Sequence, residues 1–172
     1  GTMGTALATA ACKGIDPSEV VITDVVTEKG QKLADELGCN FVETNGEAIK
    51  AAHYVVFCVK PQFLYGVIDE IKNSVSDNTV IVSIVAGQAI ETIEKAFEHN
   101  IKLVRVMPNT PALVGEGMAA LTPNSNVTKE ETDVVVNVFN SFGKGEVVSE
   151  NLMDAVTAVS GSSPAYVFMM IE

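Results

Sequence analysis

Short apolar runs that alternate with segments of helical spacing constrain the fold of this chain more than any other feature. The runs are rich in β-branched residues and span residues 20–23 (VVIT), 54–59 (YVVFCV), 79–85 (TVIVSIV) and 102–107 (KLVRVM). Apolar residues recur at helical spacing between them, over residues 5–12, 28–37, 47–52, 63–75 and 89–97. Nearly continuous apolar runs are typical of strands that are buried on both faces of a parallel sheet. The alternation therefore predicts an α/β fold with a doubly wound, mostly parallel sheet.

A weaker strand is expected earlier in the chain, at residues 40–43. After Met107 the regular alternation of strands and helices ends, because the prolines of Pro108-Asn109-Thr110-Pro111 predict a rigid loop. A strand at residues 118–122, a helix at 129–142 and a last strand at 146–149 follow. Residues 151–171 form two apolar helical stretches that SGSSP (160–164) separates. We expect one domain over residues 1–150 and the start of a helical domain over residues 151–172.

Composition narrows the possible partners. With 22 acidic and 11 basic residues the net charge is −11, which disfavours nucleic acid and anionic lipid as partners. Three cysteines without CxxC spacing and two histidines argue against a disulfide framework or a zinc site. No apolar run reaches the ~18 residues of a spanning helix. These features predict a soluble, cytoplasmic protein that acts on a small molecule without a metal.

Two features point to a dinucleotide. Gly1-Thr2-Met3-Gly4 stands directly before helix-forming residues, as do the last two glycines of the G-x-G-x-x-G fingerprint, where a helix N-terminus holds the pyrophosphate. Asp24 closes the VVIT run, 20 residues beyond Gly4, where an acidic residue bonds the ribose hydroxyls. An ordinary glycine turn and a helix-capping aspartate are the alternatives. Together the features favour a Rossmann-like domain, and because Lys29 is the nearest cation after Asp24, NADH is favoured over NADPH.

The carboxyl ends of the strands are where ligands bind in such a sheet. Lys60-Pro61-Gln62, Ala86-Gly87-Gln88 and the proline loop follow strands, whereas His53 and His99 precede strands and belong to the opposite edge. Without a histidine base, reduction of an imine is favoured over oxidation of an alcohol, because a protonated C=N accepts hydride by positioning alone. Lys60 is a candidate base or phosphate contact, or a surface lysine that follows a strand.

A second polar cluster, Ser160-Gly161-Ser162-Ser163, stands in an apolar setting. Its hydroxyls, and the free N–H groups of a helix that begins near Pro164, would suit a small carboxylate. The alternative is a plain helix-helix turn with a capping serine.

Residues 104–121, VRVMPNTPALVGEGMAAL, closely resemble the signature of pyrroline-5-carboxylate reductases. Supporting matches are GTMG at Gly1, VKPQ at Val59, SIVAG at Ser83 and DAVTAVSGSSPAYVF at residues 154–168. The resemblance implies a Rossmann-like NAD(P)H domain followed by a helical domain that forms an intertwined homodimer or a higher oligomer. It also implies hydride transfer to the C=N carbon of L-1-pyrroline-5-carboxylate, which gives L-proline in the last step of its biosynthesis.

The resemblance assigns site residues one by one, though none as a certain catalytic group. The cofactor residues are Gly1, Thr2, Met3, Gly4, Asp24, Val59, Lys60, Pro61, Ala86, Gly87, Met107, Pro108, Asn109 and Thr110. The substrate residues are Ser160, Gly161, Ser162 and Ser163.

Some features depart from the family. Many relatives have glycine where Ser163 stands, and many carry Asn-Arg where this chain has Asp24-Val25. Relatives also continue well beyond residue 172, so we expect a fragment that lacks the first strand and most of the dimerisation domain. The open alternatives are a non-catalytic dinucleotide-binding regulatory module and a β-hydroxyacid dehydrogenase-like relative, although the latter uses a lysine and residues 151–172 contain none.

Overall fold

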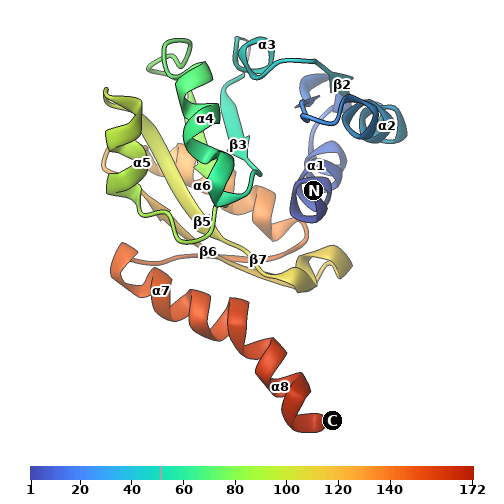
Figure 1. The fold of residues 1–172 in the computed structure, drawn as a ribbon, viewed down its shortest axis with the longest axis vertical. Coiled ribbons are helices and arrows are strands. Elements are labelled where there is room, and N and C mark those ends of the chain that lie inside the picture. The colour runs from blue at the N-terminus through green and yellow to red at the C-terminus, as the bar shows by residue number, and fades with distance from the viewer. Residues whose placement is uncertain (51) are drawn as a thin grey trace.

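A computed structural model describes residues 1–50 and 52–172, in which helices cover both faces of a five-stranded sheet (Figure 1). The sheet has the order β3-β4-β5-β6-β7, made of β3 (Tyr54–Phe57), β4 (Val80–Ser83), β5 (Lys102–Met107), β6 (Gly117–Pro123) and β7 (Gly143–Val147). Strands β3, β4 and β5 are parallel, β6 is antiparallel to β5, and β7 is parallel to β6. A separate parallel pair consists of β1 (Val21–Ile22) and β2 (Asn40–Phe41). The predicted α/β fold with a mostly parallel sheet is confirmed.

The helices occupy the segments between the strands. They are α1 (Thr2–Gly14), α2 (Thr27–Leu37), α3 (Asn45–Ile49), α4 (Pro61–Ile71), α5 (Ile90–Phe97), α6 (Lys129–Asn140), α7 (Met153–Val156) and α8 (Ser163–Ile171). Short 3-10 segments are η1 (Pro17–Glu19), η2 (Thr110–Val114) and η3 (Glu150–Leu152), and a π-helical turn is η4 (Thr157–Ser162). Local sequence explains where several begin. In α6, for example, the Thr128 hydroxyl accepts from the Glu131 N–H while the Glu131 carboxylate accepts from the Thr128 N–H, which forms a capping box.

The core has two layers, because successive side chains of each strand point to opposite faces of the sheet. On one face, residues such as Val82 and Val104 pack with Leu7 of α1 and Phe139 of α6. On the other face, residues such as Ile81, Leu103 and Phe57 pack with buried residues of α4 and α5. Strand β4 is buried along its whole length. The nearly continuous apolar runs of the sequence are therefore explained by burial on both faces.

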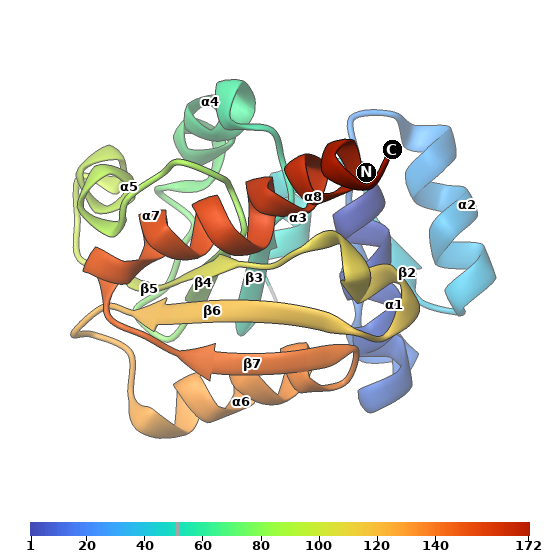
Figure 2. The ribbon, with the colours of Figure 1, turned by 90° about the horizontal axis from the view of Figure 1, so that it is seen from below.

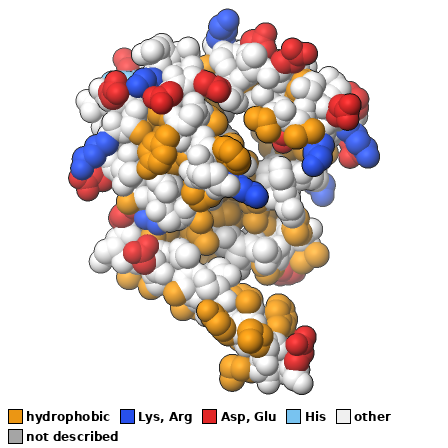
Figure 3. Space-filling view, in the orientation of Figure 1, with side chains coloured by type: hydrophobic (Ala, Val, Ile, Leu, Met, Phe, Trp, Pro, Cys, Tyr) orange, Lys and Arg blue, Asp and Glu red, His pale blue; other side chains and the backbone are white. Residues whose placement is uncertain are grey.

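The C-terminal helices leave the sheet as an arm (Figures 1 and 2). In α8 the side chains from Tyr166 to Ile171 are 50% or more exposed, and Figure 3 shows hydrophobic atoms gathered over this arm. Within the described residues, no helix is long and apolar enough to cross a membrane.

Several predicted bounds are wrong. Helix α1 begins at Thr2 rather than residue 5, so Gly4 lies inside the helix, and β7 begins at Gly143 rather than residue 146. The proline loop is not free of helix, since η2 starts at Thr110 and its proline occupies an early position where no N–H is required. The predicted helix 47–52 corresponds to α3, and residue 51 lies outside the described residues.

The expected break at SGSSP is also wrong. The chain stays helical from Met153 to Ile171, and η4 supplies a π turn directly before Pro164. A proline cannot donate to the carbonyl four residues earlier, and the wider π turn accommodates it. The N–H of Ser163 donates to the carbonyl of Ala158, so it is not one of the free N–H groups that a new helix would have there.

Candidate active site

A cleft of about 360 Å³ opens at the carboxyl ends of β3, β4 and β5, beside the N-terminus of α1. Its lining consists of Gly1, Thr2, Met3, Gly4, Cys58, Val59, Lys60, Pro61, Ile84, Ala86, Met107 and Pro108. The volume is within the range of small-molecule sites. Segments that are far apart in the sequence thus meet where ligands of doubly wound sheets bind.

The N-terminus of α1 forms one wall of the cleft. The first N–H groups of a helix have no acceptor within it, and in α1 the N–H of Thr5 is the first to bond, to the Gly1 carbonyl at 2.9 Å. Gly4 is needed for packing rather than for a turn, because an added Cβ would lie 3.2 Å from Cβ of Cys58. The glycine lets α1 approach β3 closely, and this keeps its positive end at the cleft.

Asp24 lies outside the lining but beside it. Its Oδ2 is 3.9 Å from the Gly1 nitrogen, and its Oδ1 accepts a hydrogen bond of 2.9 Å from the Val26 N–H. The side chain is 31% exposed. The partly exposed carboxylate therefore stands next to the first residue of the GTMG segment.

Cys58 and Ile84 line the cleft and were missed by the sequence reasoning. Both belong to predicted strands, where an apolar residue is expected to be part of the core. The signal that could have identified them is their position near the carboxyl end of each strand. Burial raises the pKa of the Cys58 thiol to about 11. Cys58 is therefore a neutral wall residue at neutral pH rather than a nucleophile.

The loops after β3 and β4 also contribute residues to the cleft. Lys60 is exposed and stands at the N-cap of α4, with Pro61 as the first residue of the helix. Ala86 lines the cleft, whereas Gly87 does not and adopts a left-handed φ of 71° that favours glycine. The Tyr65 hydroxyl donates to Gln88 Oε1 over 2.8 Å, which ties this loop to α4.

The residues at the end of β5 and in the loop after it have different neighbours: some line the cleft and one bonds to the C-terminal arm. Met107 and Pro108 line the cleft, whereas Thr110 is exposed and begins η2. The Asn109 side chain turns away from the lining: its Nδ2 donates to Ser160 Oγ over 3.0 Å, and its Oδ1 accepts from the Met118 N–H over 2.8 Å.

Only part of the serine cluster borders this loop. An added Cβ at Gly161 would lie 3.0 Å from Cε of Met107, so Gly161 packs closely on a cleft residue. Ser162 is exposed, and the Ser163 hydroxyl donates to the Ala158 carbonyl over 2.9 Å. Ser160 and Gly161 therefore contact the segment at the end of β5 and the loop after it, whereas the Ser163 hydroxyl bonds to a carbonyl of its own helical segment.

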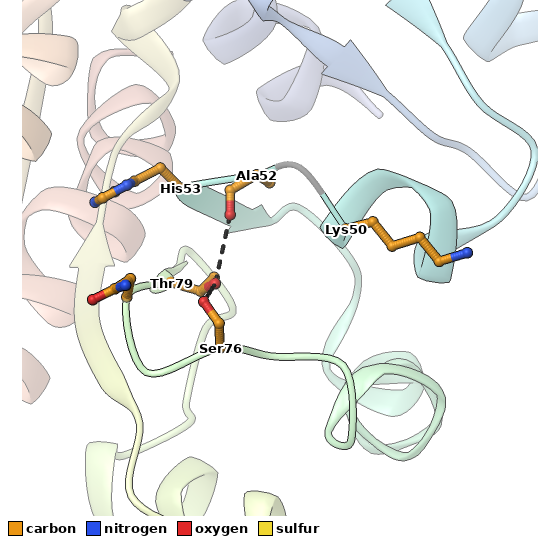
Figure 4. A pocket seen from close by; sticks show the side chains of 6 residues that line it. Lys50, Ala52, His53, Ser76 and Thr79 are labelled. Carbon is orange, nitrogen blue, oxygen red and sulfur yellow. Dashed lines mark hydrogen bonds between the residues drawn. The ribbon is translucent and has the colours of Figure 1, made fainter.

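The opposite edge of the sheet holds a smaller pocket of about 170 Å³, shown in Figure 4. Lys50, Ala52, His53, Ser76, Asn78 and Thr79 line it. The Ser76 and Thr79 hydroxyls bond each other at 2.9 Å, and Thr79 also bonds the Ala52 carbonyl at 3.5 Å. His53 therefore lies at the amino end of β3, away from the larger cleft. His99 likewise lies before the amino end of its strand, β5.

Comparisons with known proteins now decide the family. A family model described as "NADP oxidoreductase coenzyme F420-dependent" matches residues 1–87, and one described as "Pyrroline-5-carboxylate reductase dimerisation" matches residues 150–172. The pyrroline-5-carboxylate reductase of Escherichia coli K12 is 41% identical over 156 residues, which are 91% of this chain and 58% of that protein. The chain belongs to the pyrroline-5-carboxylate reductase family.

Solved structures of the pyrroline-5-carboxylate reductase family agree. The reductase from Coxiella burnetii has a TM-score of 0.93 and 28% identity, over 99% of this chain and 64% of that one. The Plasmodium falciparum enzyme, solved with NADP bound, has a TM-score of 0.87 and 32% identity, over 99% of this chain and 63% of that one. This chain therefore spans somewhat less than two thirds of the length of these relatives.

Proposed function

We propose that the full-length protein reduces L-1-pyrroline-5-carboxylate to L-proline with a reduced nicotinamide dinucleotide, as the last step of proline biosynthesis. The observation that carries the proposal is the cleft, in which the GTMG helix start, the VKP loop and the MP loop of a pyrroline-5-carboxylate reductase sequence line one cavity. The dinucleotide-binding unit is proposed to span residues 1–150, with the helical unit beginning at residue 151.

The residues present fit a dinucleotide. Gly4 allows the close approach of α1 to β3, and the N–H groups at the start of α1 face the same cleft. Lys60, exposed at the mouth, adds a positive charge for phosphate. When bound, the reduced nicotinamide supplies the hydride. Gly1, Thr2, Met3, Gly4, Val59, Pro61, Ala86, Met107 and Pro108 would hold the cofactor, together with Cys58 and Ile84.

The cofactor is proposed to be NADH in preference to NADPH. The Plasmodium falciparum relative was solved with NADP bound. In this chain the Asp24 carboxylate stands 3.9 Å from the Gly1 nitrogen and is 31% exposed. Such a carboxylate accepts hydrogen bonds from ribose hydroxyls and repels a 2′-phosphate.

The substrate is proposed to lie between the cleft and the serine cluster. Ser160, Gly161 and Ser162 belong to η4 and Ser163 begins α8, in the middle of the C-terminal arm, and Gly161 packs on Met107 of the cleft. Reduction adds a hydride to the C=N carbon and leaves the nitrogen with its proton, so the site must orient a protonated imine rather than remove a hydroxyl proton. Within the described residues no histidine lines the cleft, which suits this chemistry.

The partner is proposed to be a second copy of the protein. The exposed side chains from Tyr166 to Ile171 are apolar around the whole of α8, and the matching family model for residues 150–172 is described as a dimerisation region. A large exposed apolar surface favours burial against another subunit.

The test is an assay of the full-length protein. The oxidation of NADH and of NADPH is followed with pyrroline-5-carboxylate, and the reduction of NAD and NADP is followed with a β-hydroxyacid. We expect turnover with the imine and a lower KM for NADH than for NADPH. Turnover with the hydroxyacid alone, or dinucleotide binding without any turnover, would overturn the proposed reaction, and a clear preference for NADPH would overturn the cofactor assignment.

A further inference from the structure

Asn109 has a side-chain amide whose two ends face different partners. The backbone N–H of Met118 can only donate, so the atom of Asn109 that meets it at 2.8 Å is the oxygen Oδ1. The amide nitrogen Nδ2 is then turned toward Ser160 Oγ, at 3.0 Å. Strand β6 therefore sets the orientation of the amide, and with it the kind of hydrogen bond that Ser160 receives.

Ser160 consequently uses its oxygen as an acceptor. A hydroxyl has one proton, and an NH₂ group can only donate, so the hydroxyl proton of Ser160 is left for another acceptor. Within the described part of the chain, no hydrogen bond donated by this hydroxyl is present. The Ser160 side chain is half-buried beside the loop after β5.

Other hydroxyls of the same helical segment behave differently. Thr157 Oγ1 donates to the Met153 carbonyl over 2.8 Å, and Ser163 Oγ donates to the Ala158 carbonyl over 2.9 Å. Such bonds back to the helix are the usual choice of serine and threonine in helices. Ser160 departs from this behaviour: within the described residues its hydroxyl accepts from Asn109 and makes no bond back to its own helix.

We propose that Asn109 is a positioning residue that keeps the Ser160 hydroxyl turned as a donor toward the carboxylate of the substrate. The inference rests on the proposed function, and it moves Asn109 from the cofactor residues that the resemblance assigns to a residue that acts through Ser160. The close packing of Gly161 on Met107 holds the two segments at the distance that this hydrogen bond requires. A carboxylate is the substrate group that gains most from an oriented O–H donor.

The experiment is a double-mutant cycle in the full-length protein. In Asn109→Asp, one carboxylate oxygen still accepts from Met118, but the other oxygen now accepts from Ser160 and draws its proton away from the substrate. We expect KM for pyrroline-5-carboxylate to rise about 10-fold in Ser160→Ala and at least as much in Asn109→Asp, because a hydrogen bond to a charged group is lost. KM for the dinucleotide should stay within about 2-fold, given that neither side chain lines the cleft.

The double variant decides how Asn109 acts. If it acts through Ser160, then Asn109→Asp adds less than about 3-fold to the KM of Ser160→Ala, because the two changes remove the same interaction. Additive effects would mean that the new carboxylate acts on the substrate directly, and would overturn the inference. A larger change in the KM for the dinucleotide than in the KM for the imine would return Asn109 to the cofactor pocket and would also overturn it.

A matched control and a second readout complete the test. Thr157→Val removes a hydroxyl of the same segment that donates to its own helix, and it should leave both KM values unchanged. Calorimetric binding of L-proline to the full-length protein with oxidised dinucleotide measures carboxylate recognition without turnover. If turnover with the imine is absent but L-proline binding weakens in Ser160→Ala and Asn109→Asp, the proposed reaction fails and the positioning role survives. Unchanged L-proline binding in both variants overturns the positioning role.

Discussion

The guanidinium of Arg105 donates a hydrogen bond of 2.6 Å to Glu150 Oε1 and so joins the middle of the sheet to the start of the C-terminal arm. The Arg105 side chain is 9% exposed and lies in register with Ser83 of β4 and Thr122 of β6, which are both buried. The same carboxylate oxygen accepts from the Ile90 N–H at the start of α5, at 3.2 Å. Glu150 therefore links β5, α5 and the arm.

Removal of Glu150 should cost more stability than a surface ion pair does. Glu150→Ala leaves the Arg105 guanidinium buried with Asp154 as its remaining carboxylate, at 3.8 Å. We expect the free energy of unfolding to fall by about 1–3 kcal/mol, because the buried Arg105 loses its nearest carboxylate while Glu150 itself is 36% exposed. Urea denaturation of the full-length protein measures the change.

The matched control is the exposed pair of Lys129 and Asp133, which also bond at 2.6 Å but lie on the surface of α6. Asp133→Ala should cost about 0.5 kcal/mol or less. Equal losses in Glu150→Ala and Asp133→Ala would show that the Arg105 contact does not stabilise the junction.

Gly4→Ala should weaken dinucleotide binding. Its Cβ would lie 3.2 Å from Cβ of Cys58, so α1 or β3 must shift by a few tenths of an ångström. We expect a stability loss of about 1–3 kcal/mol, as for overpacked cores, and a higher Kd for NADH by calorimetry. The control is Gly14→Ala, in the same helix, because nothing lies within 4 Å of its added Cβ. It should neither lower the stability nor raise the Kd for NADH.

Asp24→Asn should reduce the discrimination against NADPH. Loss of the carboxylate charge removes its repulsion of a 2′-phosphate, and we expect the ratio of KM for NADPH to KM for NADH to fall about 10-fold, which corresponds to about 1.4 kcal/mol. Asp35→Asn, on the exposed surface of α2, serves as the charge-matched control. An unchanged ratio in Asp24→Asn would remove Asp24 from the ribose site.

Cys58 should make stability fall in alkali. Burial raises the pKa of its thiol from 9.0 to about 11, so the folded protein keeps a proton that the unfolded chain releases between these values. The stability that Cys58 contributes is therefore complete below pH 9 and is lost as pH rises toward 11, at up to about 1.4 kcal/mol per pH unit. The measurement is the difference in unfolding free energy between the protein and Cys58→Ala from pH 8 to 10.5. Other titrating groups, Cys12 among them, are common to both proteins, so a difference that does not depend on pH would contradict this assignment.

The sequence predicted well whatever depends on neighbours along the chain. Apolar runs such as KLVRVM are strands because their residue types suit a doubly buried sheet, and the loops that follow these strands reach the cleft because parallel strands share a carboxyl edge. The positions of Lys60, Ala86 and Pro108 in the cleft lining followed from that rule. His53 was placed at the opposite edge by the same rule.

The bounds of helices were predicted less well, because local signals compete. Gly4 was expected directly before the helix, yet it lies inside α1, where it packs against Cys58. Ser163 and Pro164 suggested the start of a helix, yet tertiary contacts keep the segment helical through a π turn. Local propensity is a weak prior where packing can override it.

By itself, the sequence determined the α/β alternation, the edge of the sheet that carries the cleft, and the family, because these depend on residue type and order along the chain. Only the tertiary structure decided that Asn109 turns from the cleft to Ser160, 51 residues away, and that Arg105 meets Glu150, 45 residues away. The physical reason is that a hydrogen bond depends on the distance and direction between two groups. Those quantities exist only after the sheet has brought the segments together.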